Sequence, residues 1–269
     1  MSIAPGTHVM YTIRPGDTLY SIANQFGSSV EAIVQANALY PPITEPDYIR
    51  PGQKVLVRVP GTSQQSVVLH QVTEGDTMFH LAERYSVGLD LLAAVNQMQH
   101  PDILRVAQLI YIPAFVHEVE QGDSLYAISR RYGVSLNEII RANQGRLALS
   151  ADLIYPQFKL VIPLPSSTNI AVFSPLPGSV IADGSVLSGV ARAFEATVLY
   201  QIKDEQERTV TNERFFTASA GGPAFGQFQA SIEIDQTPQT ANGTLLVYTR
   251  SAKDGSIQDL VEVPVKFNL

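Results

Sequence analysis

A short motif occurs three times in the chain, and its residue types suit the binding of a neutral, polar ligand. The copies begin at Gly16, Gly75 and Gly122, and each reads Gly-Asp, then Thr or Ser, then Leu or Met. Glycine permits close backbone approach, and the next residues offer amide groups beside an aliphatic side chain. An N-acetylated sugar presents matching hydroxyl, amide and methyl groups. A strand-to-helix turn with a helix cap requires the same residues, so a purely structural role stays open.

Other reactive side chains are arranged poorly for catalysis. The five histidines lack metal-ligand spacing, and the sequence contains no zinc-protease or nucleophile-elbow motif. His70 and His117 occupy the repeat position that Tyr11 holds in the first copy, which indicates a strand. Glu118 and Glu120 could in principle hydrolyse a glycan, but their alternation is typical of a solvated strand face. We therefore expect a protein that is not an enzyme, with no catalytic residue, no metal and no cofactor.

Composition and charge limit the class of partner. A hydrophobic content of 45% over 269 residues indicates a folded protein, and the absence of cysteine excludes disulfides and thiolate chemistry. The net charge of −7, without a basic cluster, argues against nucleic acid. No apolar run approaches the roughly 20 residues of a membrane helix, so we expect no membrane span. Residues 1–7 lack the basic and apolar regions of a secretion signal, so no signal peptide is predicted in this chain.

The motif belongs to a longer internal repeat. An asparagine follows each motif glycine by 21 residues, at Asn37, Asn96 and Asn143. Hydrophobic spacing predicts a strand, two helices and a strand in each copy, with the two strands paired antiparallel. Capping boxes are predicted at 28–31 and 135–138, and Asp or Thr is expected to cap the first helix. We expect each asparagine to end the second helix and to bond the loop that follows. The predicted strands are 8–13, 54–59, 70–73, 108–112, 118–121 and 159–163.

Beyond residue 165 the helical spacing ends and short β-rich runs follow. Seven runs in about 100 residues predict an antiparallel sandwich. They are 169–173, 186–190, 196–202, 210–217, 225–234, 244–249 and 261–267, with a turn at 253–256 before the last. The fold class is therefore multidomain, α+β followed by all-β. The predicted parts are an N-terminal tail at 1–7, modules at 8–60, 67–114 and 115–164, linkers at 61–66 and 165–168, and the sandwich at 169–269.

The repeats resemble the lysin motif (LysM) domain. The shared features are the first strand, the Gly-Asp-Thr/Ser-Leu turn, the Ile-Ala helix, the asparagine, and Ile-Arg-Pro-Gly-Gln at 49–53. Copies two and three depart from this last sequence at 105–108 and 154–158. The resemblance implies βααβ modules that bind peptidoglycan, or another chitin-like polymer of β-1,4-linked N-acetylglucosamine, in a shallow groove. Three sites on one chain can gain about 10²-fold in affinity for a polymer if they engage together.

In LysM domains the groove lies between the loop after the first strand and the loop after the second helix. The resemblance implies these glycan-binding residues: Gly16, Asp17, Thr18, Leu19, Asp47, Tyr48 and Ile49 in copy one; Gly75, Asp76, Thr77, Met78, Asp102, Ile103 and Leu104 in copy two; Gly122, Asp123, Ser124, Leu125, Asp152, Leu153 and Ile154 in copy three. Because copies two and three depart from the pattern in the second loop, we expect copy one to bind most tightly.

The β-rich region resembles the immunoglobulin-like domain family associated with bacterial spore germination proteins. The residues that carry this resemblance are 174–178, 188–192, 194–196, Phe228 and 251–255. Phe194 and Glu195 are the most conspicuous of them, although a Phe in a β-rich run is usually a core residue.

Two functional hypotheses follow. In the first, the modules anchor the protein to peptidoglycan or a related polymer, without catalysis, and the sandwich is displayed at the bacterial cell envelope or spore surface. In the second, the protein is a structural component of a spore coat or appendage, and the modules and sandwich make protein–protein contacts or self-assemble. A cell-wall hydrolase is a third possibility, which loss of turbidity of purified peptidoglycan would reveal.

Overall fold

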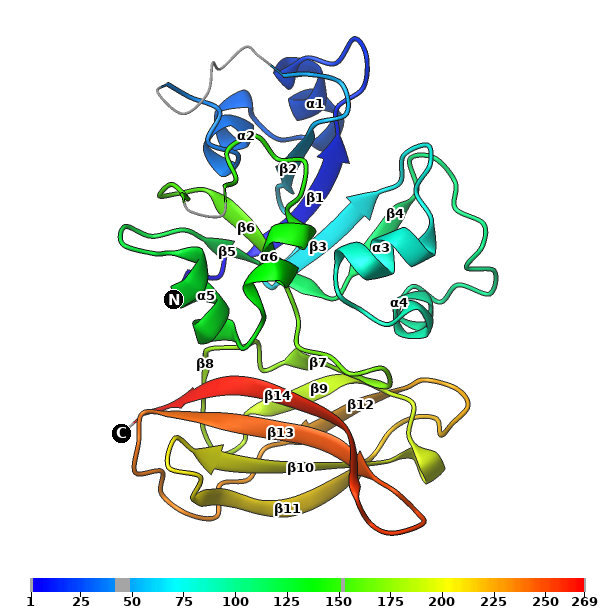
Figure 1. The fold of residues 1–269 in the computed structure, drawn as a ribbon, viewed down its shortest axis with the longest axis vertical. Helices are drawn as coiled ribbons and strands as arrows, with labels where there is room; N and C mark the ends of the chain where they lie inside the picture. The colour runs from blue at the N-terminus through cyan, green and yellow to red at the C-terminus, as the bar shows by residue number, and fades with distance from the viewer. Residues whose placement is uncertain (1, 42–48, 151–152, 269) are drawn as a thin grey trace. The chain divides into compact units, whose positions relative to one another are not determined.

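The computed structural model describes residues 2–41, 49–150 and 153–268, which form two compact units (Figure 1). The first contains residues up to Ser86 with Met98–Ser129 and Ser135–Pro163, and the second contains Val87–Gln97, Arg130–Val134 and the chain from Leu164 onward. The repeats lie largely in the first unit and the β-rich region lies in the second. No described helix is long and apolar enough to cross a membrane.

Each repeat folds as a strand, two short helices and a strand, as predicted, and we name the repeats modules 1, 2 and 3. Module 1 comprises β1 (Gly6–Thr12), α1 (Leu19–Phe26), α2 (Val30–Ala36) and β2 (Lys54–Val59). Module 2 comprises β3 (Ser66–Gln71), α3 (Met78–Arg84), α4 (Leu89–Val95) and β4 (Leu109–Ile112). Module 3 comprises β5 (Ala114–Glu118), α5 (Leu125–Tyr132), α6 (Leu136–Ala142) and β6 (Lys159–Pro163).

Helix α1 begins and ends at residues that the sequence indicated. The Thr18 hydroxyl accepts a hydrogen bond from the Ser21 amide at 3.0 Å, and the Ser21 hydroxyl accepts one from the Thr18 amide at 2.9 Å. Gly27 ends the helix in the left-handed region, at φ 62°. Of the two predicted caps, Thr18 is therefore the cap, and Asp17 has another role.

The two predicted capping boxes have different outcomes. Ser135 and Glu138 form the expected reciprocal box at the start of α6. The box predicted at 28–31 was wrong, because α2 starts one residue later than that pattern requires. Ser29 is its cap, and the Ser29 hydroxyl accepts from the Ala32 amide at 3.1 Å.

The strands pair antiparallel within each module, as predicted. The prediction for β5 was wrong, because this strand spans Ala114–Glu118 rather than 118–121. Glu120 instead donates its amide to the Asp123 carboxylate at 3.0 Å, which commits the segment to a turn.

The modules are also joined to one another, which no sequence pattern predicted. Strands β1 and β3 pair in parallel, so modules 1 and 2 share a four-stranded sheet in the order β2-β1-β3-β4. The segment predicted as an N-terminal tail pairs with module 3: Ile3 bridges His117, and the Ala4 amide donates to the Val116 carbonyl at 2.8 Å. Residues 6 and 7 belong to β1, and Ser66, placed in a linker, begins β3.

Two of the repeated asparagines tie the second helix to the last strand. The Asn37 amide nitrogen donates to the carbonyls of Ile33 (2.8 Å) and Leu56 (2.9 Å), and its oxygen accepts from the Leu56 amide (2.8 Å). Asn143 repeats this arrangement with Ile139 and Val161. The expected bond to the following loop is therefore replaced by a bond to the strand.

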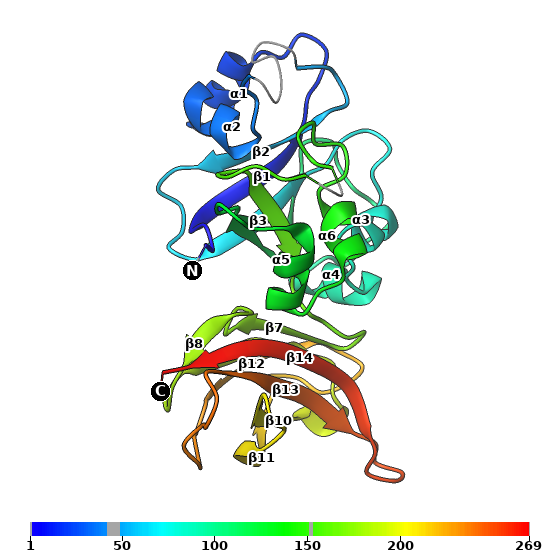
Figure 2. The same cartoon turned by 60° about the vertical axis from the view of Figure 1, so that its left-hand side comes forward.

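The β-rich region consists of two sheets, whose strands are labelled in Figure 2, and confirms the sandwich. One sheet has the order β12-β9-β7 and the other β11-β10-β13-β14-β8. The seven predicted runs correspond to β7 (Ile170–Ser174), β9 (Val186–Ala191), β10 (Thr197–Asp204), β11 (Thr209–Thr217), β12 (Gly226–Ser231), β13 (Asn242–Arg250) and β14 (Ile257–Phe267). The three-residue β8 (Ser179–Ile181) was missed and pairs parallel with β14, so this sheet is not wholly antiparallel.

The sandwich core fills the space between the inner faces of the two sheets. Val198, Leu245 and Phe228 are among its buried residues. Gly189 in β9 permits the close packing, because a Cβ there would lie 2.1 Å from the Ala171 carbonyl oxygen. The predicted turn before β14 is present, with the Asp254 carboxylate accepting from the Ser256 amide at 3.1 Å.

Candidate functional site

The three motif turns have nearly the same backbone shape. Gly16, Gly75 and Gly122 adopt φ values of 88°, 87° and 88°, in the region that disfavours other residues. A Cβ atom added to any of them would meet nothing within 4 Å, so the conformation, and not crowding, requires glycine. All three glycines are exposed. The turn backbone is therefore open to a ligand in every module.

The motif aspartates face the strand that precedes each turn. Asp17 accepts from the Tyr11 hydroxyl at 2.6 Å and from the Arg14 amide at 2.7 Å. Burial and the hydrogen bond to Asp17 raise the pKa of Tyr11 to about 12, so this phenol stays a donor at neutral pH. Asp123 contacts the His117 ring at 2.9 Å. These carboxylates close the turn, which agrees with a structural role but not with helix capping.

Module 2 has the most extensive version of this arrangement. The Asp76 carboxylate contacts His70 Nε2 at 3.1 Å and accepts from the amide and hydroxyl of Thr73. Burial raises the pKa of Asp76, but the hydrogen bonds from His70 and Thr73 outweigh it and hold that pKa well below its usual range. Burial lowers the pKa of His70. A neutral His70 that donates from Nε2 can accept at Nδ1 from the Tyr85 hydroxyl, 2.9 Å away.

The remaining side chains of the motif also have local structural roles. Thr77 and Ser124 cap their helices as Thr18 does, each accepting an amide hydrogen bond at 3.1 Å. Leu19, Met78 and Leu125, which were predicted to contact glycan, are buried in the module cores. What the motif leaves accessible is therefore its backbone and its small polar side chains.

The predicted second wall of the groove is only partly described by the structure. Ile49 is half-buried and packs against the module 1 core cluster, of which Leu19 is a member. In module 2, Ile103 is 63% exposed, and in module 3, Leu153 is 52% exposed. Asp102 is exposed, and Leu104 and Ile154 are half-buried. Asp47, Tyr48 and Asp152 lie outside the described residues.

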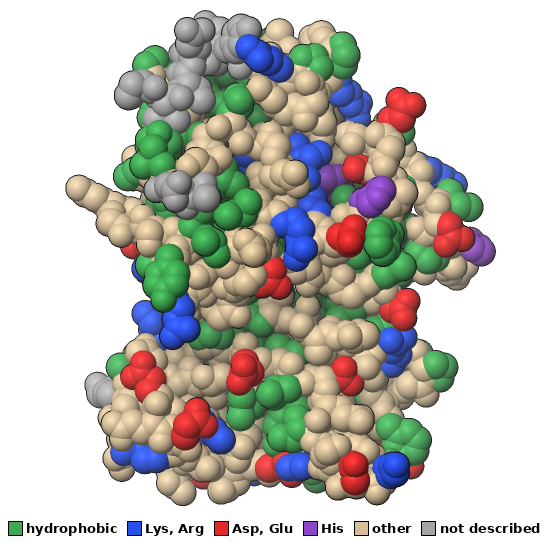
Figure 3. All heavy atoms as spheres, viewed as in Figure 1, with side chains coloured by type: hydrophobic (Ala, Val, Ile, Leu, Met, Phe, Trp, Pro, Cys, Tyr) green, Lys and Arg blue, Asp and Glu red, His purple; other side chains and the backbone are tan. Residues whose placement is uncertain are grey.

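One set of exposed residues was missed by the sequence analysis. Tyr20, Phe79 and Tyr126 follow the motif directly, and their exposed fractions are 69%, 56% and 69%. An aromatic ring in water next to an open polar turn suits stacking on the apolar face of a sugar. The recurrence of an aromatic residue at this position was the signal that could have identified them. In the part of Figure 3 that the first unit occupies, hydrophobic side chains lie in separate patches.

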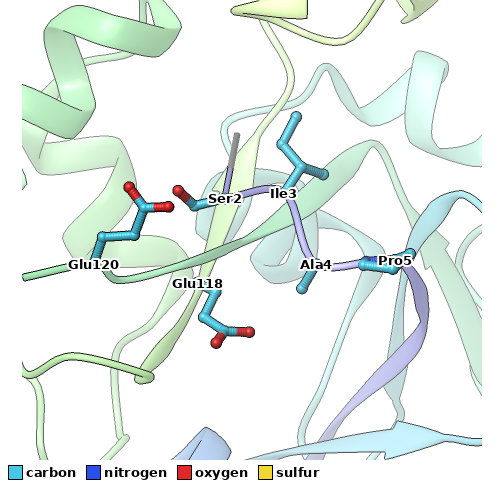
Figure 4. Close-up of a pocket in the computed structure, with 6 residues that line it drawn as sticks. All are labelled: Ser2, Ile3, Ala4, Pro5, Glu118 and Glu120. Carbon is cyan, nitrogen blue, oxygen red and sulfur yellow. The ribbon is translucent and has the colours of Figure 1, made fainter.

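A pocket of about 250 Å³ lies elsewhere in the first unit, between the N-terminal segment and the end of β5 (Figure 4). Its lining is Ser2, Ile3, Ala4, Pro5, Glu118 and Glu120. The two carboxylates point to different sides in Figure 4, and Glu118 is paired with Lys159 at 2.5 Å. Among the residues that the structure describes, no group of three or more His, Asp or Glu side chains is placed to hold a metal ion.

Comparison with known proteins identifies relatives of part of the chain. The chain is 34% identical over 110 residues to the secreted LysM effector ECP6 of Passalora fulva, covering 40% of this chain and 47% of that protein. It is 33% identical over 97 residues to the probable autolysin SsaALP of Staphylococcus aureus, covering 33% and 35% respectively. Among solved structures, it is similar to the Bacillus cereus spore cortex-lytic enzyme SleL, with 33% identity, coverage of 39% and 22%, and a TM-score of 0.30. The chain spans less than half the length of each of these relatives.

Two family models match, one to each of the three modules and the other to the sandwich up to the residue before β14. Residues 11–58, 70–113 and 117–163 match the LysM domain, which together is more than half of the chain. Residues 169–256 match the immunoglobulin-like domain of bacterial spore germination. The LysM matches support binding of peptidoglycan or chitin, and the two families together indicate association with a cell wall or spore. The chain therefore belongs to the LysM domain family, with three copies of the domain followed by an immunoglobulin-like domain of bacterial spore germination.

Proposed function

We propose that the protein is a non-catalytic anchor, in which modules 1 to 3 bind an N-acetylglucosamine polymer of a bacterial envelope or spore and hold the sandwich there. The observation that carries the proposal is the repeated open turn. Gly16, Gly75 and Gly122 share one conformation, each is exposed, and each is followed by an exposed aromatic ring. A polymer of identical sugar units meets an equivalent surface three times.

Sedimentation with insoluble peptidoglycan, with chito-oligosaccharide as competitor, tests the proposal. The test variant carries Gly16→Ala, Gly75→Ala and Gly122→Ala, because a side chain at these φ values forces the turn backbone to change. The matched control carries Gly61→Ala, Gly184→Ala and Gly255→Ala, which have φ values of 73°, 82° and 71° and equally open surroundings outside the motif. We expect the test variant to stay in the supernatant and the control to sediment. Equal sedimentation of both variants would contradict the site.

The absence of catalysis is part of this proposal and rests on what the acidic residues do. The motif carboxylates close turns, and Glu118 is engaged by Lys159 while Glu120 points to another side of the pocket. A glycosidase instead needs two carboxyl groups on either side of one scissile bond. We expect purified peptidoglycan to keep its turbidity when the protein is added. A fall in turbidity that Glu120→Gln abolishes would establish hydrolysis instead.

A second candidate function is assembly of a spore structure through protein contacts. Phe194 and Phe215 of the sandwich are 71% and 72% exposed, whereas aromatic residues in a β-rich domain are usually buried. Sedimentation velocity of the soluble protein separates the candidates. Ordered multimers that Phe215→Ser dissolves, together with no binding to peptidoglycan, would favour assembly, and a monomer that binds peptidoglycan favours anchoring.

A further inference from the structure

Two positively charged side chains from different modules lie close enough for the charge of one to act on the other. Lys54 begins β2 of module 1, and Arg84 ends α3 of module 2. Both residues contact the segment after α6: the Lys54 amide donates to the Gly145 carbonyl at 2.9 Å, and Arg84 Nη2 donates to the Gln144 carbonyl. The two side chains are half-buried, so solvent reaches both. Because they come from separate modules, no run of basic residues marks the pair in the sequence.

The hydrogen-bond partners of the pair are neutral groups. Lys54 Nζ donates to the Thr12 hydroxyl at 2.7 Å, which uses one of its three hydrogens. Arg84 donates to two backbone carbonyls, that of Gln144 and, at 3.4 Å, that of Ala142. Neither side chain forms an ion pair with a carboxylate that the structure describes. The pair therefore has donors and charge to offer to an anion.

The charges around the pair do not balance. Burial, and then the positive charge of Arg84, lower the pKa of Lys54, while Asp76 raises it. Burial, and then Arg84, also lower the pKa of Arg146 to about 9, so this buried guanidinium is charged at neutral pH. Among the described residues, Asp76 is the one carboxylate whose charge acts on Lys54 or Arg146, and it already has donors within module 2. Three cations and one carboxylate leave two excess positive charges, which an anion would stabilise.

The pair lies beside the motif turn of module 2. Asp76 belongs to that turn and acts on the charge of Lys54. Burial is the largest cause that lowers the pKa of His70; Asp76 raises that pKa, and Lys54 and Arg84 lower it, so both cations also lie near the ring that bonds Asp76. The Gly75 backbone of the same turn is exposed. Figure 3 shows Lys and Arg side chains next to histidine and acidic side chains at the surface of the first unit. A sugar chain on this turn would bring its substituents to the pair.

We propose that Lys54 and Arg84 form an anion site, which binds a carboxylate carried by the polymer at the module 2 turn. An ammonium group and a guanidinium match the oxygens of a carboxylate, and their half-buried position strengthens the attraction relative to open water. The inference rests on the proposed function and narrows its ligand, because an acidic N-acetylated chain would bind better than a neutral one. Peptidoglycan carries such groups on the lactyl ethers of alternate sugars, whereas chitin is uncharged.

Two synthetic ligands that differ in one group measure this preference. Both are tetrasaccharides of alternating N-acetylglucosamine and N-acetylmuramic acid, and the lactyl groups are free carboxylates in one and methylamides in the other. Calorimetric titration of the full chain should give an affinity about tenfold higher for the acid, because each of two partly exposed charge contacts contributes about threefold. Lys54→Met combined with Arg84→Met should reduce the ratio to about one and leave the affinity for the methylamide unchanged.

The matched control is Lys253→Met combined with Arg130→Met. It removes one lysine and one arginine charge from exposed positions outside the pair and should keep the tenfold ratio. If the double variant of the pair does not fold, Lys54→Met alone should reduce the ratio to about threefold. Arg84→Lys keeps the charge but not the geometry of the carbonyl contacts, so it should keep most of the ratio. Equal affinities of the unchanged protein for the acid and the methylamide would overturn the inference and leave the proposed function intact.

A second measurement uses acetate and needs no glycan. In an NMR titration of the lysine side chains, acetate should raise the pKa of Lys54, since a bound anion favours the charged form, and should leave the resonances of Lys253 unchanged. A larger response of Lys54 to inorganic phosphate than to acetate, at equal ionic strength, would overturn the assignment to a carboxylate. If neither tetrasaccharide binds but acetate still acts on Lys54, the proposed function fails and the anion site is supported. No response of Lys54 to either ion would overturn the inference.

Discussion

Modules 1 and 2 bury a histidine in their first strand in different surroundings. His70 in β3 lies against the Asp76 carboxylate and the Tyr85 hydroxyl. In β1, Tyr11 takes the place next to the motif aspartate, and His8 lies fully buried with its Nδ1 3.0 Å from the Gly6 carbonyl oxygen. His8 Nε2 has no hydrogen-bond partner in the described structure. The comparison shows that either a phenol or an imidazole can close the turn. We expect the buried His8 imidazole, whose Nε2 has no hydrogen-bond partner, to make module 1 sensitive to acid.

The largest expected effect is the acid response of module 1. Burial, and then the charge of Lys159, lower the pKa of His8 from 6.5 to about 4. The pKa of His8 is lower in the folded state than in the unfolded state, so protonation of His8 destabilises the folded state. The free energy of unfolding therefore has its full value above pH 6.5 and decreases as the pH falls toward 4. We expect about 3 kcal/mol to be lost in this window. Urea unfolding measures the free energy of unfolding at pH 7 and at pH 4, both for the unchanged protein and for His8→Leu. If this free energy changes by the same amount between the two pH values in both proteins, His8 is not the cause of the acid response.

The second effect is the loss of stability when the carboxylate of a motif turn is removed, compared between modules 2 and 1. Asp76→Ala leaves the His70 ring and the Thr73 amide without their acceptor, and Asp17→Ala leaves the Tyr11 hydroxyl and the Arg14 amide. Each unsatisfied buried group costs about 1–3 kcal/mol. We expect a loss of about 3 kcal/mol for Asp76→Ala and about 2 kcal/mol for Asp17→Ala, because Asp76 also accepts from the Thr73 hydroxyl. Denaturant unfolding measures both losses. A larger loss for Asp17→Ala than for Asp76→Ala would contradict the expected difference between the two modules.

A third effect is expected when the aromatic pair of module 2 is replaced by the residue types of the aromatic pair in module 1. Module 1 pairs Tyr11 with Phe26 edge to face at 5.6 Å, and module 2 pairs His70 with Tyr85 at 5.8 Å. The double substitution His70→Tyr with Tyr85→Phe should fold and change the free energy of unfolding by about 1 kcal/mol, because shape and the bond to Asp76 are kept. His70→Tyr alone should be less stable than the double variant, since the Tyr85 hydroxyl loses its acceptor. Unfolding of both proteins at pH 7 provides the test.

The smallest effect on stability is expected at the exposed aromatics. Tyr20→Ala should change the free energy of unfolding by less than about 0.5 kcal/mol, as is usual for exposed positions. The affinity of module 1 for the N-acetylglucosamine tetramer should nevertheless fall about fivefold, equivalent to about 1 kcal/mol. Calorimetric titration measures this, with Tyr155→Ala, outside the motif, as the control. An unchanged affinity would remove Tyr20 from the site.

Much of the fold follows from local patterns. Thr18, Gly27 and Ser135 set helix ends through bonds that span three to five residues, so their residue types and spacing suffice for prediction. The short β8 carried too few residues for a pattern, and β5 was misplaced because the turn bond between Glu120 and Asp123 uses residues that also alternate like a strand.

The sequence predicted where the three motif turns lie, but not the direction of each side chain in them. Leu19 and its equivalents are buried, and the aspartates bond inward to Tyr11, His70 and His117. The direction in which a side chain points depends on neighbouring strands, which a motif does not contain. The exposed rings at Tyr20 and its equivalents became apparent only once the module cores were known.

The sequence alone determined the repeat, the order of elements within it and the sandwich that follows, because helix caps, turns and hydrophobic periods act between near neighbours. Only the tertiary structure decided how the modules meet. Arg146 contacts Asn37 across 109 positions of the chain, and β1 pairs with β3 in parallel. Contacts over such separations depend on where whole modules pack, and no spacing within a single repeat records that arrangement.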